Sequence, residues 1–111
     1  MKAKTVGMEI ARFARVISDP TRQQLMRMLC CRWLCVSDLV GPLGVTQPTV
    51  SHHLSILRGA GLVRLRRDGK QVFYTLNQDQ VTICCGRIMR TLAPERSMRE
   101  SDRAPAQEMG G

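Results

Sequence analysis

A short amphipathic helix followed at once by a β-hairpin is the feature that most restricts the fold of this chain. Val50, Leu54 and Leu57 recur with the spacing of one helical face, which must point toward a core. Thr46 can cap the first turn of this helix, and Pro48 is tolerated there because the first turn lacks intrahelical N–H partners. The pattern therefore predicts a helix with one buried face and one polar face.

The hairpin is predicted by the residues that follow. The glycines of GAG at 59–61 end the helix, and LVRLRRDGKQVFYTL at 62–76 then alternates apolar and polar residues. Two such runs joined by Asp68-Gly69 carry the strongest short-range signal for a β-hairpin. We expect a two-stranded wing with a basic tip.

Two helices are expected near the start of the chain. Apolar residues at helical spacing predict the first over residues 5–17. The second begins with Pro20 in its first turn, capped by Ser18 or Asp19. The apolar stripe of this second helix is Leu25, Met28 and Leu29.

A third helix is expected to be short, capped by Ser37 and closed by Gly44. Pro42 falls late in it, where a proline costs a backbone hydrogen bond, so the helix should be short or bent. A last helix should begin at about Asp79. One face of that last helix carries Val81, Cys84, Cys85, Ile88 and Leu92.

This order of elements is that of a winged helix-turn-helix, a mainly α fold with about five helices and one hairpin wing. A length of 111 residues allows one domain with a single modest core. We expect residues 1–93 to form that winged helix-turn-helix domain. Residues 94–111 are rich in proline, glycine and mixed charge, so a disordered tail is expected there.

The net charge of +8 indicates a polyanionic partner, either nucleic acid or an anionic membrane surface. The charge belongs to residues 1–93, which hold 14 Lys and Arg against 5 Asp and Glu. No apolar run approaches the roughly 18 residues of a membrane span, and the start lacks a secretory apolar region. Five cysteines, four of them in adjacent pairs, suit reduced thiols, so we expect a cytoplasmic protein without a membrane partner.

Short hydrogen-bonding side chains on the outward face of the helix after Thr46 can meet base edges in a major groove of duplex DNA. Gln47 is expected to read a base, because the N-terminal residues of a recognition helix reach deepest. His52 and His53 lie about 100° apart on the helix, so they cannot share a metal as an i, i+4 pair could. Basic residues at the hairpin tip suit phosphates or a minor groove. The candidate DNA contacts are Gln47, Thr49, Ser51, His52, His53, Ser55, Arg58, Arg66, Arg67 and Lys70.

The segments SDPTRQQLMRML and VTQPTVSHHLSILRGAGLVRLRRDGKQVFYTL resemble the ArsR/SmtB family of bacterial metal- and thiol-responsive repressors. The resemblance covers roughly residues 8–92. It implies a homodimer built from the first and last helices, which binds an imperfect palindrome in its own promoter. An inducer would then release the repressor from double-stranded operator DNA, with no resident cofactor required.

The resemblance leaves the inducer site open. Arsenic-sensing members often carry ELCVCDL, whereas this chain has WLCVSDL, so Cys35 matches the first thiol and Ser37 replaces the second. Trivalent arsenic or antimony takes about three sulfurs, and soft thiolates prefer such ions. The first candidate set is Cys30, Cys31 and Cys35, and the second is Cys84 and Cys85. The second pair also suits packing at a dimer interface, since cysteine behaves as a small hydrophobe.

The first hypothesis for function is a repressor released by an arsenite- or antimonite-type metalloid. The alternatives are a persulfide- or redox-sensing repressor that uses two separated thiols, and a constitutive repressor with structural cysteines. Zinc sensing at the usual family site is not expected, because the last helix has no histidine. An enzyme is not expected either, because no orienting carboxylate accompanies Cys35 and His52. The few aromatic residues argue against a single-strand binder.

Overall fold

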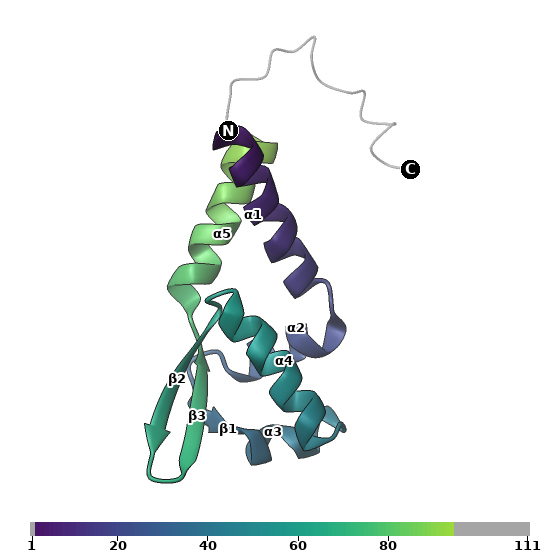
Figure 1. Ribbon diagram of the computed structural model, residues 1–111, viewed down its shortest axis with the longest axis vertical. Helices are drawn as coiled ribbons and strands as arrows, with labels where there is room; N and C mark the ends of the chain where they lie inside the picture. Colours follow the sequence, from purple (N-terminus) through teal and green to yellow (C-terminus); the bar gives the residue numbers. More distant parts are fainter. Residues whose placement is uncertain (1, 95–111) are drawn as a thin grey trace, which may run out of the picture.

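The computed structural model describes the backbone of residues 2–94 and the side chains of residues 9–94. Its fold is a winged helix-turn-helix, which confirms the predicted fold class (Figure 1). The elements in chain order are α1 (Lys2–Ile17), α2 (Pro20–Met28), β1 (Leu34–Cys35), α3 (Val36–Leu43), α4 (Gln47–Gly59), β2 (Val63–Asp68), β3 (Gln71–Leu76) and α5 (Gln78–Leu92). Residues 95–111, which make up nearly all of the expected tail, lie outside the described residues.

Local capping places α2 and α4 as predicted. The carboxylate of Asp19 accepts a hydrogen bond of 3.0 Å from the backbone N–H of Arg22, and Pro20 occupies the first turn of α2. The hydroxyl of Thr46 accepts from the backbone N–H of Thr49 at the start of α4. Gly44 closes α3 at φ +66°, a left-handed conformation that glycine adopts without steric cost.

Helix α3 begins earlier than expected, so the predicted cap on Ser37 is wrong. Cys35 is the N-cap residue, and its backbone N–H donates to the carboxylate of Asp38 over 3.0 Å. Residues 34 and 35 are extended because they pair with β3, and the helix starts where that pairing ends. Ser37 therefore lies within the first turn. The helix is short, as expected with Pro42 inside it.

The three strands form an antiparallel sheet in the order β1-β3-β2. Leu34 pairs with Tyr74 and Cys35 with Phe73, while Phe73 pairs on its other side with Arg66. Strand β1 has only two residues, too few for an alternating pattern, and the sequence did not predict it. It ties the segment after α2 to the hairpin.

The hairpin turn lies one residue later than predicted. Asp68 is the last residue of β2 and pairs with Gln71, so Gly69 and Lys70 form the two-residue connection. Gly69 adopts φ +64°, which explains why glycine is needed there. The shift leaves Lys70 at the tip.

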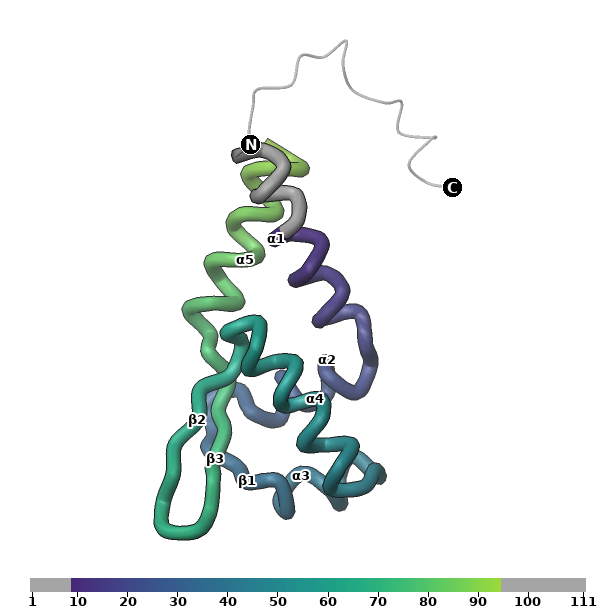
Figure 2. Tube along the Cα trace, viewed as in Figure 1, coloured from purple at the N-terminus to yellow at the C-terminus, as the bar shows by residue number. Residues whose placement is uncertain are grey.

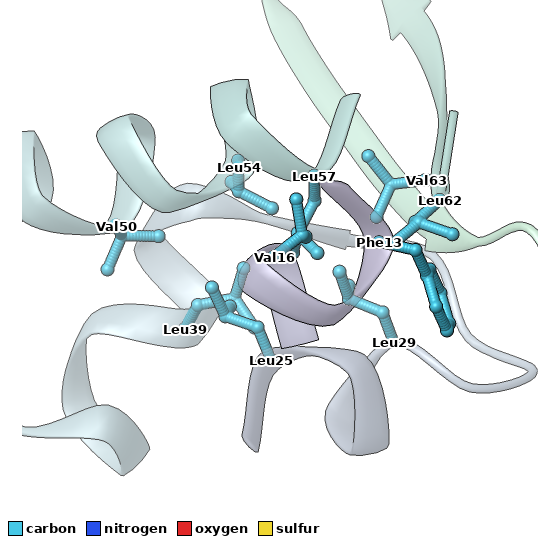
Figure 3. Close-up of a cluster of buried hydrophobic side chains, with 10 residues drawn as sticks. All are labelled: Phe13, Val16, Leu25, Leu29, Leu39, Val50, Leu54, Leu57, Leu62 and Val63. Carbon is cyan, nitrogen blue, oxygen red and sulfur yellow. The ribbon is translucent and has the colours of Figure 1, made fainter. Parts of the chain in front are cut away.

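Ten side chains from the four helices α1 to α4, the residue after α2 and the segment that enters β2 meet in one buried cluster (Figure 3). The predicted inward face of α4 is confirmed, because Val50, Leu54 and Leu57 are all at most 1% exposed. Burying this face directs the polar face of α4 outward. The cluster consists of Phe13, Val16, Leu25, Leu29, Leu39, Val50, Leu54, Leu57, Leu62 and Val63.

Helix α5 packs against this cluster with only part of its predicted apolar face. Val81, Cys84 and Ile88 are half-buried against the core. Cys85 and Leu92 are exposed in the single chain, so packing of these two residues at a dimer interface stays a prediction. From the end of β3, α5 runs away from α2, α3 and α4 and converges with α1 (Figure 2).

Candidate DNA-binding surface and thiol cluster

The outward face of α4 and the hairpin tip form the candidate DNA-binding surface. The N-terminal turn of α4, helix α3 and the tip all lie toward the end of the molecule opposite the C-terminal turns of α5 (Figure 1). Gln47 is exposed in the first turn of α4, where Thr46 and Pro48 set the start of the helix. The other exposed candidates are Ser51, His52, Ser55, Arg58, Arg66, Arg67 and Lys70, and Thr49 is half-buried.

His53 has different surroundings from its neighbour His52. Its Nδ1 lies 3.1 Å from Nη1 of Arg22 and 4.0 Å from the carboxylate of Asp19, and its side chain is only 14% exposed. Because an arginine can only donate, Nδ1 accepts this hydrogen bond. His53 therefore joins α4 to α2, whereas His52 is exposed on the polar face.

Arg22 is a connecting residue that sequence reasoning missed. Its Nε donates to the carbonyl of Val16 over 2.6 Å, and its Nη2 donates to the carbonyl of Arg15 over 3.2 Å. Both carbonyls belong to the last turn of α1, whose acceptors lack helical partners. One guanidinium thus links α1, α2 and α4. No sequence signal could identify this, since His53 is 31 residues away.

Cys30 and Cys31 form an exposed thiol pair directly after α2. Their sulfur atoms lie 3.8 Å apart. Nε2 of Gln78, in the first turn of α5, lies 2.8 Å from the sulfur of Cys30 and 3.4 Å from that of Cys31. We name these three residues the thiol cluster. It connects the end of α2 to the start of α5, and Gln78 was not anticipated.

Cys35, the third member of the first candidate set, has different contacts from this pair. Its thiol is buried and contacts the hydroxyl of Ser37 at 3.0 Å and the carboxylate of Asp38 at 3.2 Å. The pairing of β1 with β3 turns Cys35 toward the start of α3. Within residues 9–94, no group of three or more His, Cys, Asp or Glu side chains is arranged to hold a metal ion.

The second candidate pair diverges along α5. Adjacent residues on a helix project about 100° apart. Cys84 is half-buried, with Nε2 of Gln80 3.7 Å from its sulfur, while Cys85 is exposed. The two thiols therefore have separate surroundings in one chain.

Asp38 should make the stability of this region sensitive to acid. Its pKa is lowered, first by the backbone hydrogen bond from Cys35 and then by the hydrogen bond from the Cys35 thiol. As pH falls, the Asp38 carboxylate of the unfolded chain is protonated near its ordinary pKa of about 3.9, before that of the folded chain. The charged carboxylate therefore stabilises the folded state fully above that pH, and this stabilisation is lost as pH falls through the lower pKa of the folded chain. We expect Asp38→Asn to flatten the fall in Tm between about pH 5 and pH 3. Parallel Tm curves for the two proteins would contradict this.

No helix in the described part of the chain is long and apolar enough to cross a membrane. The described helices are arranged around the small core, and the exposed basic residues of the wing are Arg64, Arg66, Arg67 and Lys70.

Comparison with known proteins identifies the group to which these features belong. Residues 19–64 match the family described as bacterial regulatory protein, arsR family. Over 73 residues the chain is 41% identical to a transcriptional repressor SmtB homolog of Synechocystis sp., covering 66% of this chain and 55% of that protein. Over 71 residues it is 37% identical to the arsenical resistance operon repressor of Staphylococcus xylosus, covering 64% of this chain and 68% of that protein. The chain thus spans little more than half of the first relative.

Among solved structures, the fold is similar to a homodimeric winged helix-turn-helix DNA-binding domain from Mycobacterium bovis. The TM-score is 0.66 at 20% identity, and the match covers 87% of this chain and 92% of that domain. At this identity the likeness concerns the fold, which agrees with the element order described above.

Proposed function

This chain belongs to the ArsR/SmtB family of bacterial transcriptional repressors, and from that premise we propose that it binds an operator as a homodimer and leaves it when a thiophilic inducer binds Cys30 and Cys31. The inducer class we favour is arsenite or antimonite. Family members act as DNA-binding regulators, so no catalytic role is proposed. The site of action is the cytoplasm, where the bacterial chromosome lies.

The polar face of α4 supports the operator-binding part of the proposal. Gln47 stands exposed at the N-terminal end of α4, the position from which a recognition helix reaches base edges. Ser51, His52 and Ser55 continue this face, and the wing adds positive charge. Two copies of a chain with a net charge of +8 give +16, which favours the phosphate contacts that dominate DNA affinity.

Exposed apolar side chains on α5 support the homodimer. Ile83, Met89 and Leu92 of this helix are 47%, 60% and 67% exposed. Helix α1 lies against α5, where Arg87 contacts Glu9 over 2.7 Å. A second copy packed on this helix pair would bury the apolar side chains, in keeping with the homodimeric structural relative.

The thiol cluster supports the choice of inducer. Two exposed sulfur atoms 3.8 Å apart can supply two of the roughly three sulfurs that trivalent arsenic takes, whereas Cys35 is buried and Cys84 and Cys85 diverge along α5. Gln78 extends this site to α5. Inducer binding would therefore change the placement of α2 against α5, and with it the half-site spacing of about 34–36 Å that two recognition helices must match.

The test is fluorescence anisotropy of the reduced protein on the DNA upstream of its own gene, titrated separately with arsenite, zinc and a polysulfide. Release by arsenite alone is the expected result. Release by polysulfide that a reductant reverses would replace the metalloid with a redox signal. Binding that prefers the operator over random duplex by about 10³-fold or more is expected before any inducer is added. Tight binding that no reagent disturbs would indicate a constitutive repressor.

Gln47→Ala is expected to weaken operator binding by about 1–3 kcal/mol per half-site and to relax discrimination at the contacted base pair. Lys70→Ala is the matched control, because a phosphate contact at the wing should affect operator and random duplex alike. Its loss should also reduce the slope of log K against log salt by about one per contact. If Gln47→Ala weakens both DNAs equally, Gln47 does not read a base.

A further inference from the structure

Trp33 and Arg66 form a contact that neither the family assignment nor the DNA surface accounts for. The guanidinium carbon of Arg66 lies 4.5 Å from the centre of the Trp33 ring. Trp33 comes directly before β1 and is 38% exposed, while Arg66 projects from β2 two strands away. When a guanidinium stacks on an aromatic ring, its flat face contacts the ring. The N–H groups at the edge of the guanidinium stay available for a phosphate or a base edge.

The segment that carries Trp33 is fixed at both ends. At one end, the carbonyl of Leu29 accepts a hydrogen bond of 2.9 Å from the backbone N–H of Leu76 and one of 3.1 Å from the hydroxyl of Thr75. At the other end, Leu34 pairs with Tyr74. Strand β3 therefore holds both ends, and Figure 2 shows the chain passing from α2 to the hairpin and into β1.

The four residues between these anchors include both thiols of the thiol cluster and Trp33. Cys31 adopts φ +67°, a left-handed conformation that costs free energy for a residue with a side chain. Gln78, which contacts both sulfurs, lines the same pocket as Trp33, together with Arg64 and Asp79. Only Arg32 lies between Cys31 and Trp33, and the segment is fixed at both ends. A change in backbone conformation at Cys30 and Cys31 should therefore move Trp33.

We infer that Trp33 is a positioning residue that holds Arg66 in its DNA-binding orientation, and that inducer binding at Cys30 and Cys31 displaces it. When Trp33 moves, the guanidinium of Arg66 is no longer held in place for contact with DNA, and the operator is released. The second half of this inference rests on the proposed function, while the first half concerns the protein without inducer.

The first half is tested by a double-mutant cycle on operator affinity. Trp33→Leu is expected to weaken binding about two- to fivefold per half-site, as an exposed cation–π contact would. In the Arg66→Gln background the same change should have no further effect, and Trp33→Phe, which keeps an aromatic face, should restore most of the affinity. Additive effects of the two changes would overturn the inference. Circular dichroism of each variant checks that the fold is retained.

The second half is tested with the fluorescence of Trp33, which is the only tryptophan of the chain. Arsenite should change the emission of the wild type and of Cys84→Ser/Cys85→Ser, but not that of Cys30→Ser/Cys31→Ser. Arg66→Gln without arsenite should already resemble the arsenite-treated wild type. Unchanged emission during operator release would overturn the inference and leave the proposed function standing, whereas changed emission without release would count against the proposed function.

Discussion

Cys30→Ser/Cys31→Ser is expected to bind the operator with wild-type affinity and to remain bound at every arsenite concentration that releases the wild type. Serine keeps the size of the side chain and a hydrogen-bonding partner for Gln78, so the uninduced structure should persist. A hydroxyl does not bind a soft ion as a thiolate does. To move a repressor from 99% bound to 99% free, an inducer must bind the DNA-free form about 5.5 kcal/mol more tightly than the DNA-bound form. This variant lacks the thiols that would supply that difference.

The measurement is the anisotropy titration with arsenite, with Cys84→Ser/Cys85→Ser as the matched control. The control should be released like the wild type, because its two thiols diverge on α5. If the control loses the response and Cys30→Ser/Cys31→Ser keeps it, the inducer site lies on α5 and our assignment is wrong. Single substitutions would then show whether Cys30 and Cys31 contribute equally.

Leu54→Ala is expected to lower the free energy of unfolding by about 2–5 kcal/mol. Leu54 is 1% exposed and projects from α4 into the core cluster (Figure 3), so alanine leaves a cavity that the neighbouring side chains fill only in part. Domains of this size are commonly stable by about 5–15 kcal/mol, so the loss is a large fraction of the total. Because α4 also carries the polar face, operator binding should fail at a lower temperature.

Urea unfolding followed by circular dichroism checks this at one fixed protein concentration, since dimer formation makes stability depend on concentration. Ser55→Ala, the next residue along the helix, is exposed and should change stability by less than about 0.5 kcal/mol. Equal losses for the two variants would mean that α4 is not packed through Leu54.

The secondary structure could be predicted because its signals are local. A helix is encoded by residues three and four positions apart and by the cap beside them, and a hairpin by alternation around a turn. The N-cap at Thr46, the left-handed Gly44 and the inward face of α4 all follow such rules. Because the inward face is encoded locally, the opposite, polar face of α4 also follows from the sequence as a candidate DNA contact.

The error at the start of α3 arose where pairing between distant segments overrides a local rule. Ser37 is a good capping residue, but strand pairing of Leu34 and Cys35 with β3 starts α3 earlier and buries the Cys35 thiol. A two-residue strand has no periodicity that reasoning from sequence could detect. That one pairing also places the Cys35 thiol beside Ser37 and Asp38 at the start of α3.

The sequence by itself thus determined the helices, the hairpin, the outward face of α4 and the family, because neighbouring residues encode these through backbone geometry and periodic burial. Only the tertiary structure decided which side chains meet. Arg22 reaches His53 across 31 positions, and Gln78 reaches Cys30 across 48. Such partners depend on how whole elements pack, since a shift of one helical turn, about 5.4 Å, would break every one of these contacts.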